Sequence, residues 1–236
     1  MTGLREMMKK TMKKQRWQRC GLTVVLALAS AAGMQGQTPD VAAQVQAQLK
    51  PGQQLEPPII DSSEAMTGSH VYFASSTITH QDSKGGNYDE TFIDAYLLFA
   101  DQAGHWHSVW FDRYNEDGGV PQIASVFFAH ADHDPHSKEL IVLVQTPQRH
   151  YDYSGDFYDG YVYKITGTPY AGAVFVALQT DASAPFQGQC DCASRDGGKD
   201  GNGRDSNAPY KTAAQIRKAL AAKYPVVKSP AVKDGK

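Results

Sequence analysis

Complete catalytic motifs are absent from this chain of 236 residues. It contains neither the Gly-x-Ser-x-Gly motif of serine hydrolases nor the His-Glu-x-x-His motif of zinc peptidases. Its Gly-rich stretch, Asp196–Gly203, lacks the preceding strand and the following helix that a phosphate-binding loop requires. The sequence therefore assigns no reaction, and a non-enzymatic role is the leading expectation.

Long apolar runs are also missing. The run Leu22–Ala29 is short for a membrane span, which needs about 20 apolar residues. It follows a strongly basic segment, and small residues from Ser30 to Gly33 come after it. A basic head, a short apolar core and small residues predict a secretory signal peptide, here residues 1–32. We therefore expect a periplasmic or secreted protein, with an uncleaved membrane anchor as the alternative.

Positive charge is scarce outside this leader. The chain has 23 Lys and Arg against 25 Asp and Glu, and removal of the leader leaves 16 basic and 24 acidic residues. The resulting net charge of −8 excludes nucleic-acid binding, which requires a basic face. It favours solubility, a basic protein partner or a cation such as Ca²⁺.

Cysteines are few, with three in the whole chain. Cys20 precedes the apolar run, so it is not the lipid-modified cysteine of a lipoprotein and is lost with the leader. Cys190 and Cys192 then remain, and two thiols in an oxidising compartment are expected to form a disulfide. A redox-active pair or a soft-metal site is the alternative.

Alternating apolar patterns are lacking at both ends of the exported chain. We interpret residues 33–69 as a flexible N-terminal segment with one loose helix at Asp40–Lys50, which has little to bury. Residues 181–210 are interpreted as a Gly/Asp-rich loop and residues 226–236 as a tail. Between these two, residues 211–225 predict a helix, because apolar residues recur there at four-residue steps.

Seven β-branched and aromatic runs fill residues 70–180, separated by turns rich in Gly, Asp and Asn. They cover Val71–Thr79, Phe92–Ala100, His105–Phe111, Ile123–Ala129, Glu139–Gln145, Gly160–Thr166 and Gly172–Gln179. Short strands at even spacing are typical of antiparallel folds. The sequence therefore predicts a mainly β protein: a single antiparallel meander, sandwich, small barrel or propeller-like domain with a C-terminal helix.

One polar loop before an apolar strand carries several carboxylates and imidazoles. Alternate residues of a loop can turn towards one hard cation, so a Ca²⁺ site is one interpretation of this loop. Its ligands would be Asp132, Asp134, His136 and Glu139. A second ligand set for Zn²⁺ or Cu²⁺ is His130, His133 and His136, which requires a helix that Pro135 disfavours. A polar turn without metal is the third interpretation.

This loop also carries a resemblance. Asp132-x-Asp134 followed by Glu139-Leu-Ile-Val resembles the calcium-loop β repeats of exported bacterial proteins. It is similar, too, to the loop and strand of periplasmic lysozyme inhibitors and of immunity proteins against cell-wall-degrading toxins. The match extends only from Asp132 to Val144. His136 stands where the repeat has a third Asp or Asn, and the usual Gly is absent. The resemblance implies Ca²⁺ binding and an inhibitory role.

A second candidate site is the aromatic and acidic segment from Gln148 to Tyr163. Tyr161 and Tyr163 alternate with Val162, so we expect them to be half-buried in a strand. The residues before them are expected in a loop, where rigid aromatic rings beside acids are typical of protein-recognition surfaces. The predicted binding set is Tyr151, Asp152, Tyr153, Asp156 and Phe157. A plain turn is the alternative.

These features together favour an exported, non-enzymatic binding protein. The leader, the acidic charge and the resemblance indicate an inhibitor or immunity factor that blocks a basic cell-wall hydrolase. A metal-dependent hydrolase built on the Asp132–Glu139 loop is one alternative. A structural protein of the cell envelope is another.

Overall fold

The computed structural model describes residues 40–150, 153–171, 173–194 and 206–226. The predicted signal peptide over residues 1–32 and the predicted tail beyond residue 226 lie outside these ranges. No helix in the described ranges is long and apolar enough to cross a membrane.

The described chain folds mainly into β-strands, as the sequence predicts. In chain order the elements are α1 (Val41–Gln48), β1 (Gln54–Asp61), β2 (His70–Gln81), β3 (Asn87–Ala100), β4 (Trp106–Tyr114), β5 (Gln122–Ala129), β6 (Glu139–Arg149), β7 (Tyr153–Thr168), η1 (Pro169–Ala171), β8 (Ala173–Leu178), α2 (Thr180–Ser183), η2 (Ala184–Phe186), β9 (Gln189–Ser194) and α3 (Ala213–Lys223). The seven predicted runs coincide with β2 to β8. The strands β1 and β9 are additions that the sequence pattern does not predict.

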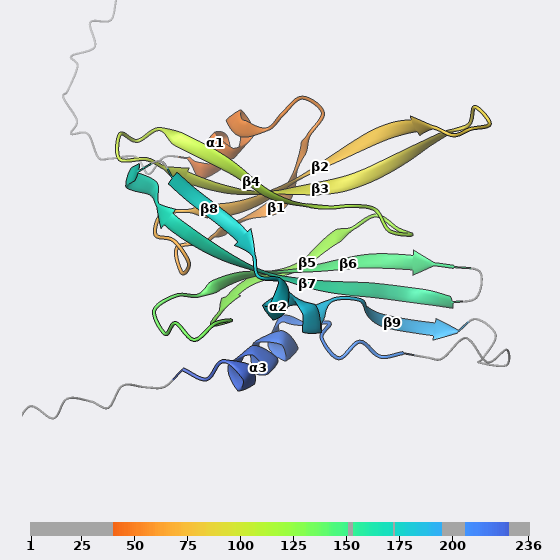
Figure 1. Cartoon of the computed structure of the whole chain (residues 1–236). Coiled ribbons are helices and arrows are strands. Elements are labelled where there is room, and N and C mark those ends of the chain that lie inside the picture. Colours follow the sequence, from red (N-terminus) through yellow and green to blue (C-terminus); the bar gives the residue numbers. More distant parts are fainter. Residues whose placement is uncertain (1–39, 151–152, 172, 195–205, 227–236) are drawn as a thin grey trace, which may run out of the picture. The chain divides into compact units, whose positions relative to one another are not determined.

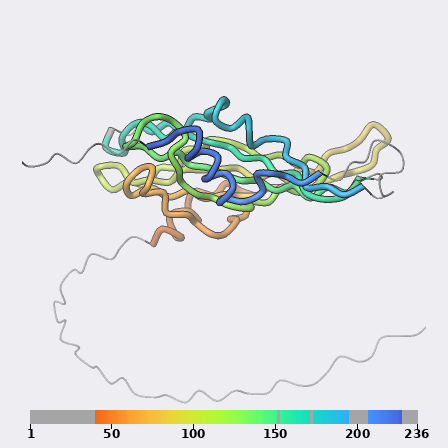
Figure 2. Tube along the Cα trace, turned by 90° about the horizontal axis from the view of Figure 1, so that it is seen from below, coloured from red at the N-terminus to blue at the C-terminus, as the bar shows by residue number. Residues whose placement is uncertain are grey.

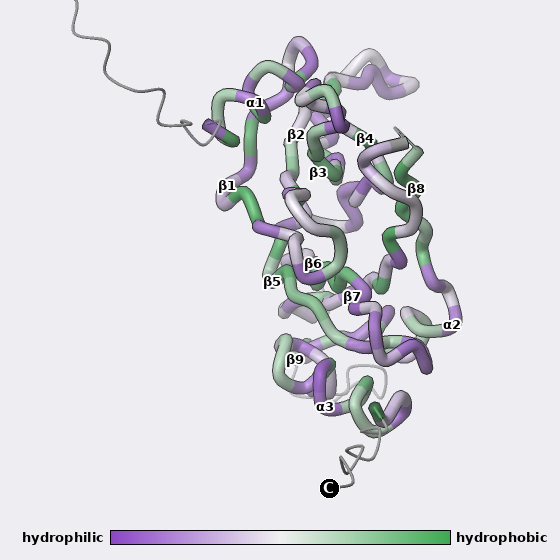
Figure 3. The backbone as a smooth tube through the Cα atoms, turned by 90° about the vertical axis from the view of Figure 1, so that its left-hand side faces the viewer, coloured by the Kyte–Doolittle hydropathy of each residue, from purple (hydrophilic) through white to green (hydrophobic). Residues whose placement is uncertain are grey.

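The strands form two antiparallel sheets (Figures 1 and 3). The first sheet has the order β1-β2-β3-β4 and the second the order β5-β6-β7-β8, with β9 paired to the first half of β7. Each sheet is a meander, because successive strands are neighbours. Within the described residues the sheets do not close into a barrel. The sandwich is therefore the predicted architecture that the structure adopts.

The main core lies between the two sheets, because every second side chain of each strand points there. The buried cluster includes Phe73, Leu97, Leu140 and Tyr163. Near the β4 edge, Phe111 packs edge-on against Tyr163, with 4.9 Å between the ring centroids. This contact closes the sandwich on that side.

The prediction that residues 33–69 are flexible is wrong for the part that the structure describes. Helix α1 buries Val45 completely in a cluster on the outer face of the first sheet. Strand β1 pairs with β2 over Gln54–Asp61. The sequence pattern hides this strand because Pro57 and Pro58 interrupt it, and proline is tolerated in a sheet only at an edge or a bulge.

The predicted loop over residues 181–210 also contains folded structure in its described part. Helix α2 and strand β9 lie there, and Phe186 is buried in the cluster beneath α3. The C-terminal helix is confirmed, since Ile216 and Leu220 of α3 are buried in the cluster on the outer face of the second sheet. Seen from below, α3 (blue) crosses over the strands of that sheet (Figure 2). The described part of the sandwich thus has α1 on the outer face of the first sheet, and α3 together with the short helix α2 on the outer face of the second (Figure 3).

Candidate functional site

One end of the sandwich carries the tips of two long hairpins. The β2–β3 and β6–β7 hairpins point the same way, and the β4–β5 connection lies at that end too (Figure 1). In an antiparallel meander every second turn falls at the same end, which explains the grouping. We call this region the hairpin end and define it as residues 77–91, 113–122, 145–150, 153–159 and 189–194.

The aromatic and acidic segment predicted as a loop is a strand. Strand β7 begins at Tyr153 and continues to Thr168. Its first half pairs with β6 on one side and with β9 on the other. The prediction that the residues before Tyr161 form a loop is therefore wrong from Tyr153 onward. This half is rich in Gly and Asp, and pairing on both sides, rather than strand propensity, keeps it extended.

Strand alternation divides the predicted binding residues between the two faces of the sheet. Tyr153 and Phe157 lie on the inner face, as does the core residue Tyr163. The rings of Tyr153 and Phe157 stack with their centroids 6.3 Å apart. His150 stacks on Tyr153 at 5.0 Å. We call Tyr153 and Phe157 the aromatic strip.

Asp156 lies on the outer face, away from the aromatic strip. It sits near Tyr158, whose pKa is raised by burial and by the charges of Asp156 and Asp191. The structure therefore separates Asp156 from the aromatic residues with which the sequence groups it. Tyr151 and Asp152, the other two predicted binding residues, lie outside the described residues.

Strand β9 brings the two cysteines beside the aromatic strip. Cys190 is opposite Phe157, and Cys192 is opposite Gly155 in the strand register. Their Cα atoms are 5.3 Å apart, and the structure joins them as the predicted disulfide. Gly155 fits this close approach, because a Cβ atom there would lie 2.2 Å from the carbonyl oxygen of Asp191.

A hollow of about 210 Å³ opens beside the aromatic strip. Its lining includes Phe157, Tyr161, Asp117, Asp159 and Arg113. The loop after β4 is fixed at the rim, because the side-chain amide of Gln148 donates to the backbone oxygen of Asp117. Carboxylates beside an aromatic ring can receive a Lys or Arg side chain.

Arg113 does not neutralise the carboxylates of this hollow, because it is engaged elsewhere. Its guanidinium donates two hydrogen bonds to Asp94, at 2.8 and 3.0 Å, and lies 3.7 Å from the ring centroid of Phe92. Asp94 also accepts a hydrogen bond from Trp110 at 3.0 Å. Burial raises the pKa of Asp94, but the hydrogen bonds from Arg113 and Trp110 outweigh it and lower the pKa overall.

Acidic residues outnumber basic ones at the hairpin end by eight to three. The acids are Asp82, Asp89, Glu90, Glu116, Asp117, Asp156, Asp159 and Asp191, and the bases are Lys84, Arg113 and Arg149. Two of these residues have partners outside the count, Arg113 with Asp94 and Asp191 with Lys211, and the two pairs offset each other in the local charge. A surface of this kind attracts basic partners at long range.

Buried tyrosines fix the base of the hairpin end. Tyr163 donates a hydrogen bond to Asp112 and shares one of 3.0 Å with the hydroxyl of Tyr114. Burial raises the pKa of Tyr161 to about 12 and raises the pKa of both Tyr114 and Tyr163 well above the usual range. These hydroxyls stay protonated at neutral pH, and those of Tyr114 and Tyr163 form hydrogen bonds between the two sheets.

The predicted metal loop is stabilised by its own polar side chains. Asp132 accepts a hydrogen bond from the backbone N–H of Asp134 at 2.8 Å, and its other oxygen pairs with Lys164. Asp134 accepts one from the backbone N–H of His136 at 2.9 Å. Burial raises the pKa of Asp132, but the bond from Lys164 contributes to lowering it overall.

Glu139, the fourth predicted ligand, is almost fully buried. It accepts hydrogen bonds from the N–H of Ala131 at 2.7 Å and from the hydroxyl of Ser137 at 3.3 Å. In the described ranges no group of three or more His, Cys, Asp or Glu side chains is arranged to hold a metal ion. His133, from the alternative ligand set, packs edge-on against Tyr224. Calcium binding remains a prediction from the sequence.

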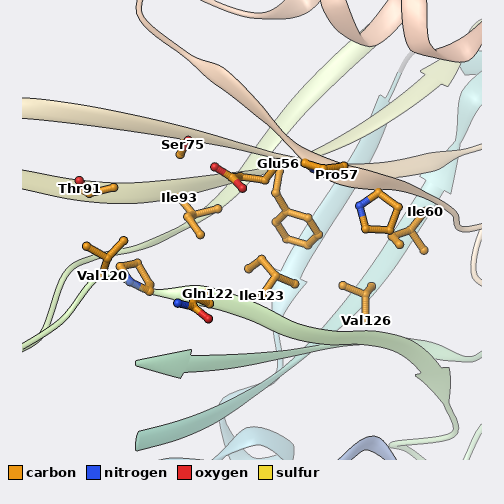
Figure 4. A pocket seen from close by; sticks show the side chains of 13 residues that line it. Glu56, Pro57, Ile60, Ser75, Thr91, Ile93, Val120, Gln122, Ile123 and Val126 are labelled. Atoms are coloured by element: carbon orange, nitrogen blue, oxygen red, sulfur yellow. The ribbon is translucent and has the colours of Figure 1, made fainter. Parts of the chain in front are cut away.

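A larger cavity, which sequence analysis misses, lies between the edge strands β1 and β5 (Figure 4). We call it the edge cleft; its volume is about 440 Å³. Its walls are mainly apolar, with Phe73 and Ile93 from the first sheet and Ile123 and Val126 from the second. These residues belong to strands far apart in the chain, so only the fold brings them together.

Glu56 is the only charged residue among the described residues that line the edge cleft. It is directly opposite Phe73 in the β1–β2 register, so its side chain shares the inner face of the sheet. Ser75, Thr91 and Gln122 supply further polar groups. Figure 4 shows the carboxylate on the same wall as Ser75 and Thr91.

Comparison with known proteins adds no family to this description. The chain matches no protein-family model, and neither curated proteins nor solved structures show a significant similarity to it. Functional inference therefore rests on the two surfaces described above.

Proposed function

We propose that this chain is an exported, non-enzymatic binding protein that recognises a basic protein through its hairpin end. The observation that carries the proposal is the partly exposed aromatic strip, Tyr153 and Phe157, set among an excess of acids. Aromatic rings give contact area at low entropy cost, and acids steer a basic partner into place. The leader predicted over residues 1–32 supports export.

The rigidity of the aromatic strip also supports recognition. The first half of β7, residues 153–159, is called its outer half. It pairs with β6 on one side and with β9 on the other, and the Cys190–Cys192 disulfide lies beside it. A surface that is already ordered loses little conformational freedom on binding. The strip is therefore suited to binding without rearrangement.

The partner that we propose within this class is a cell-wall hydrolase, with the chain acting as its inhibitor or immunity factor. The sequence resemblance from Asp132 to Val144 supports this narrower statement. Asp117 and Asp159 in the hollow beside Phe157 would receive a Lys or Arg side chain of the partner.

No contact among the described residues favours either of the two alternative functions, a metal-dependent hydrolase or a structural protein of the cell envelope. For a metal-dependent hydrolase, the carboxylates of Asp132, Asp134 and Glu139 already accept hydrogen bonds from their own loop. For a structural envelope protein, nothing in the described residues singles out a surface. We therefore carry the binding function forward alone.

Binding to a C-type lysozyme, a basic cell-wall hydrolase, tests the proposal by isothermal titration calorimetry. We expect a complex that weakens as salt is added, because surface charges are screened. The double variant Tyr153→Ala, Phe157→Ala should weaken it about tenfold or more, as loss of aromatic anchors does. Phe175→Ala is the matched control, since Phe175 is 66% exposed on the distant strand β8.

The control variant should bind as tightly as the unmodified protein. Unchanged affinity of the double variant would reject the aromatic strip as the binding surface. If neither lysozyme nor other basic cell-wall hydrolases bind, the proposed partner class is wrong.

A further inference from the structure

The edge cleft differs in chemistry from the hairpin end. Apolar side chains form most of its walls, and it holds a single carboxylate. The other side of the sandwich is closed, since Phe111 of β4 packs against Tyr163 there. The cleft is therefore a local opening into the core beside β1 and β5, with a volume typical of sites for small molecules.

The carboxylate of Glu56 has no partner in the described part of the chain: no hydrogen bond or ion pair reaches it. Other shielded carboxylates of this protein are satisfied, Asp94 by Arg113 and Glu139 by the N–H of Ala131. Glu56 is half-buried beside apolar walls, where a carboxylate loses part of its hydration. A bound cation would compensate for the hydration that this carboxylate loses, because it donates charge-assisted hydrogen bonds to it.

We propose that the edge cleft binds an amphiphilic primary amine, a small molecule with an apolar chain and one ammonium group. The alkyl chain of the ligand would lie between Ile93 and Ile123, in contact with both sheets, and its ammonium would pair with Glu56. An ammonium has three donors, and Ser75, which also lines the cleft, has a hydroxyl that can accept a hydrogen bond. This site borders the hairpin end at Thr91 and Gln122 but contains no residue of the aromatic strip, and it does not depend on the proposed protein partner.

The charge of the lining decides between ligand classes. A fatty acid would place its carboxylate beside Glu56, and like charges repel. A neutral alcohol would fill the apolar part but leave the Glu56 charge unpaired. Among the described residues, no Lys, Arg or His lines the cleft to reverse this preference. The cleft therefore favours a cationic head group over neutral and anionic ones.

Titration calorimetry of the purified protein with n-octylammonium, n-octanol and n-octanoate tests this inference. We expect octylammonium to bind, octanol to bind at least about tenfold more weakly because a charge-assisted hydrogen bond is lost, and octanoate not to bind. Glu56→Gln should reduce octylammonium affinity to that of octanol and leave octanol unchanged. Glu64→Gln is the matched control, since Glu64 is exposed and does not line the cleft.

A second variant tests whether the alkyl chain of the ligand binds in the edge cleft. Val126→Trp should fill the cleft and abolish binding of both octylammonium and octanol, with circular dichroism confirming the fold; if this variant does not fold, Ile123→Phe takes its place. Equal affinities for the three compounds, or octylammonium binding unchanged in Glu56→Gln, would overturn the inference. Binding that persists in the filled cleft would place the ligand elsewhere and overturn it too.

Discussion

The two halves of β7 carry the same kinds of side chain in different surroundings. In the inner half, residues 160–168, Tyr161 and Tyr163 pack into the core between the sheets, and Tyr163 is fully buried. In the outer half, Tyr153 and Phe157 keep the same alternation but remain partly exposed, where the two hairpins diverge (Figure 1). An aromatic face is thus core where a second sheet covers it and a candidate recognition surface where it is left open.

The two halves also differ in what stabilises them. The inner half has β8 as its neighbour and gains from burial between sheets. The outer half has β9 as its neighbour and depends on main-chain pairing with few buried side chains. Mutations should therefore affect stability mainly in the inner half and recognition mainly in the outer half.

The largest effect on stability is expected for Tyr163→Ala in the inner half. Removal of this buried ring leaves a cavity and should lower the free energy of unfolding by about 3–5 kcal/mol in urea titrations. Tyr163→Phe keeps the ring but removes the hydrogen bonds to Asp112 and Tyr114, with an expected cost of about 1–3 kcal/mol. A loss below about 1 kcal/mol for Tyr163→Ala would contradict the contrast between the halves.

Alkaline pH should unfold the protein through the same tyrosines. Because burial raises the pKa of Tyr161 to about 12, the folded state favours the protonated hydroxyl, and the associated stability is lost as pH rises from about 10 to 12. Tyr161→Phe should move the alkaline unfolding midpoint, followed by circular dichroism, to higher pH. Tyr170→Phe, at a position 75% exposed, is the control and should leave it unchanged.

An intermediate effect is expected for Gly155→Ala in the outer half. The added Cβ atom would collide with the carbonyl of Asp191 and push β9 away, at a cost of about 1–3 kcal/mol. Limited proteolysis should then cleave β9 faster, while the neighbouring variant Ser154→Ala should resemble the unmodified protein. Equal protection of β9 in both variants would show that β9 is not held by this close approach.

The smallest effect on stability is expected for Phe157→Ala. Its ring is only half-buried, so the unfolding free energy should fall by about 1 kcal/mol. Affinity for a basic hydrolase should fall far more, because an aromatic anchor is lost. A large loss of stability with unchanged affinity would assign Phe157 to the core instead.

The sequence predicts those parts of the fold that have strong apolar patterns. The seven strands β2 to β8 and the helix α3 carry such patterns, and the structure contains all of them. Strand β1 was missed because Pro57 and Pro58 interrupt it, and β9 because its pairing with β7 substitutes for apolar side chains. Both are held by neighbours distant in the sequence, which local periodicity cannot reveal.

The candidate site was predictable only in part, for the same reason. The aromatic composition pointed to Tyr153 and Phe157, but the pattern alone did not show that alternation on a strand would separate Asp156 from them. The edge cleft was missed altogether, since Glu56 and Ile123 come together only through the packing of two sheets. Residue type indicates chemistry, whereas the fold decides which residues share a surface.

Hydrogen–deuterium exchange in the presence of a C-type lysozyme tests the central claim most directly, because it maps which half of β7 the partner covers. We predict slower exchange on binding in residues 145–150, 153–159 and 189–194, with no change in residues 160–168 or in β8. Protection confined to the inner half, to β8 or to the edge strands β1 and β5 would contradict the assignment of the hairpin end as the recognition surface.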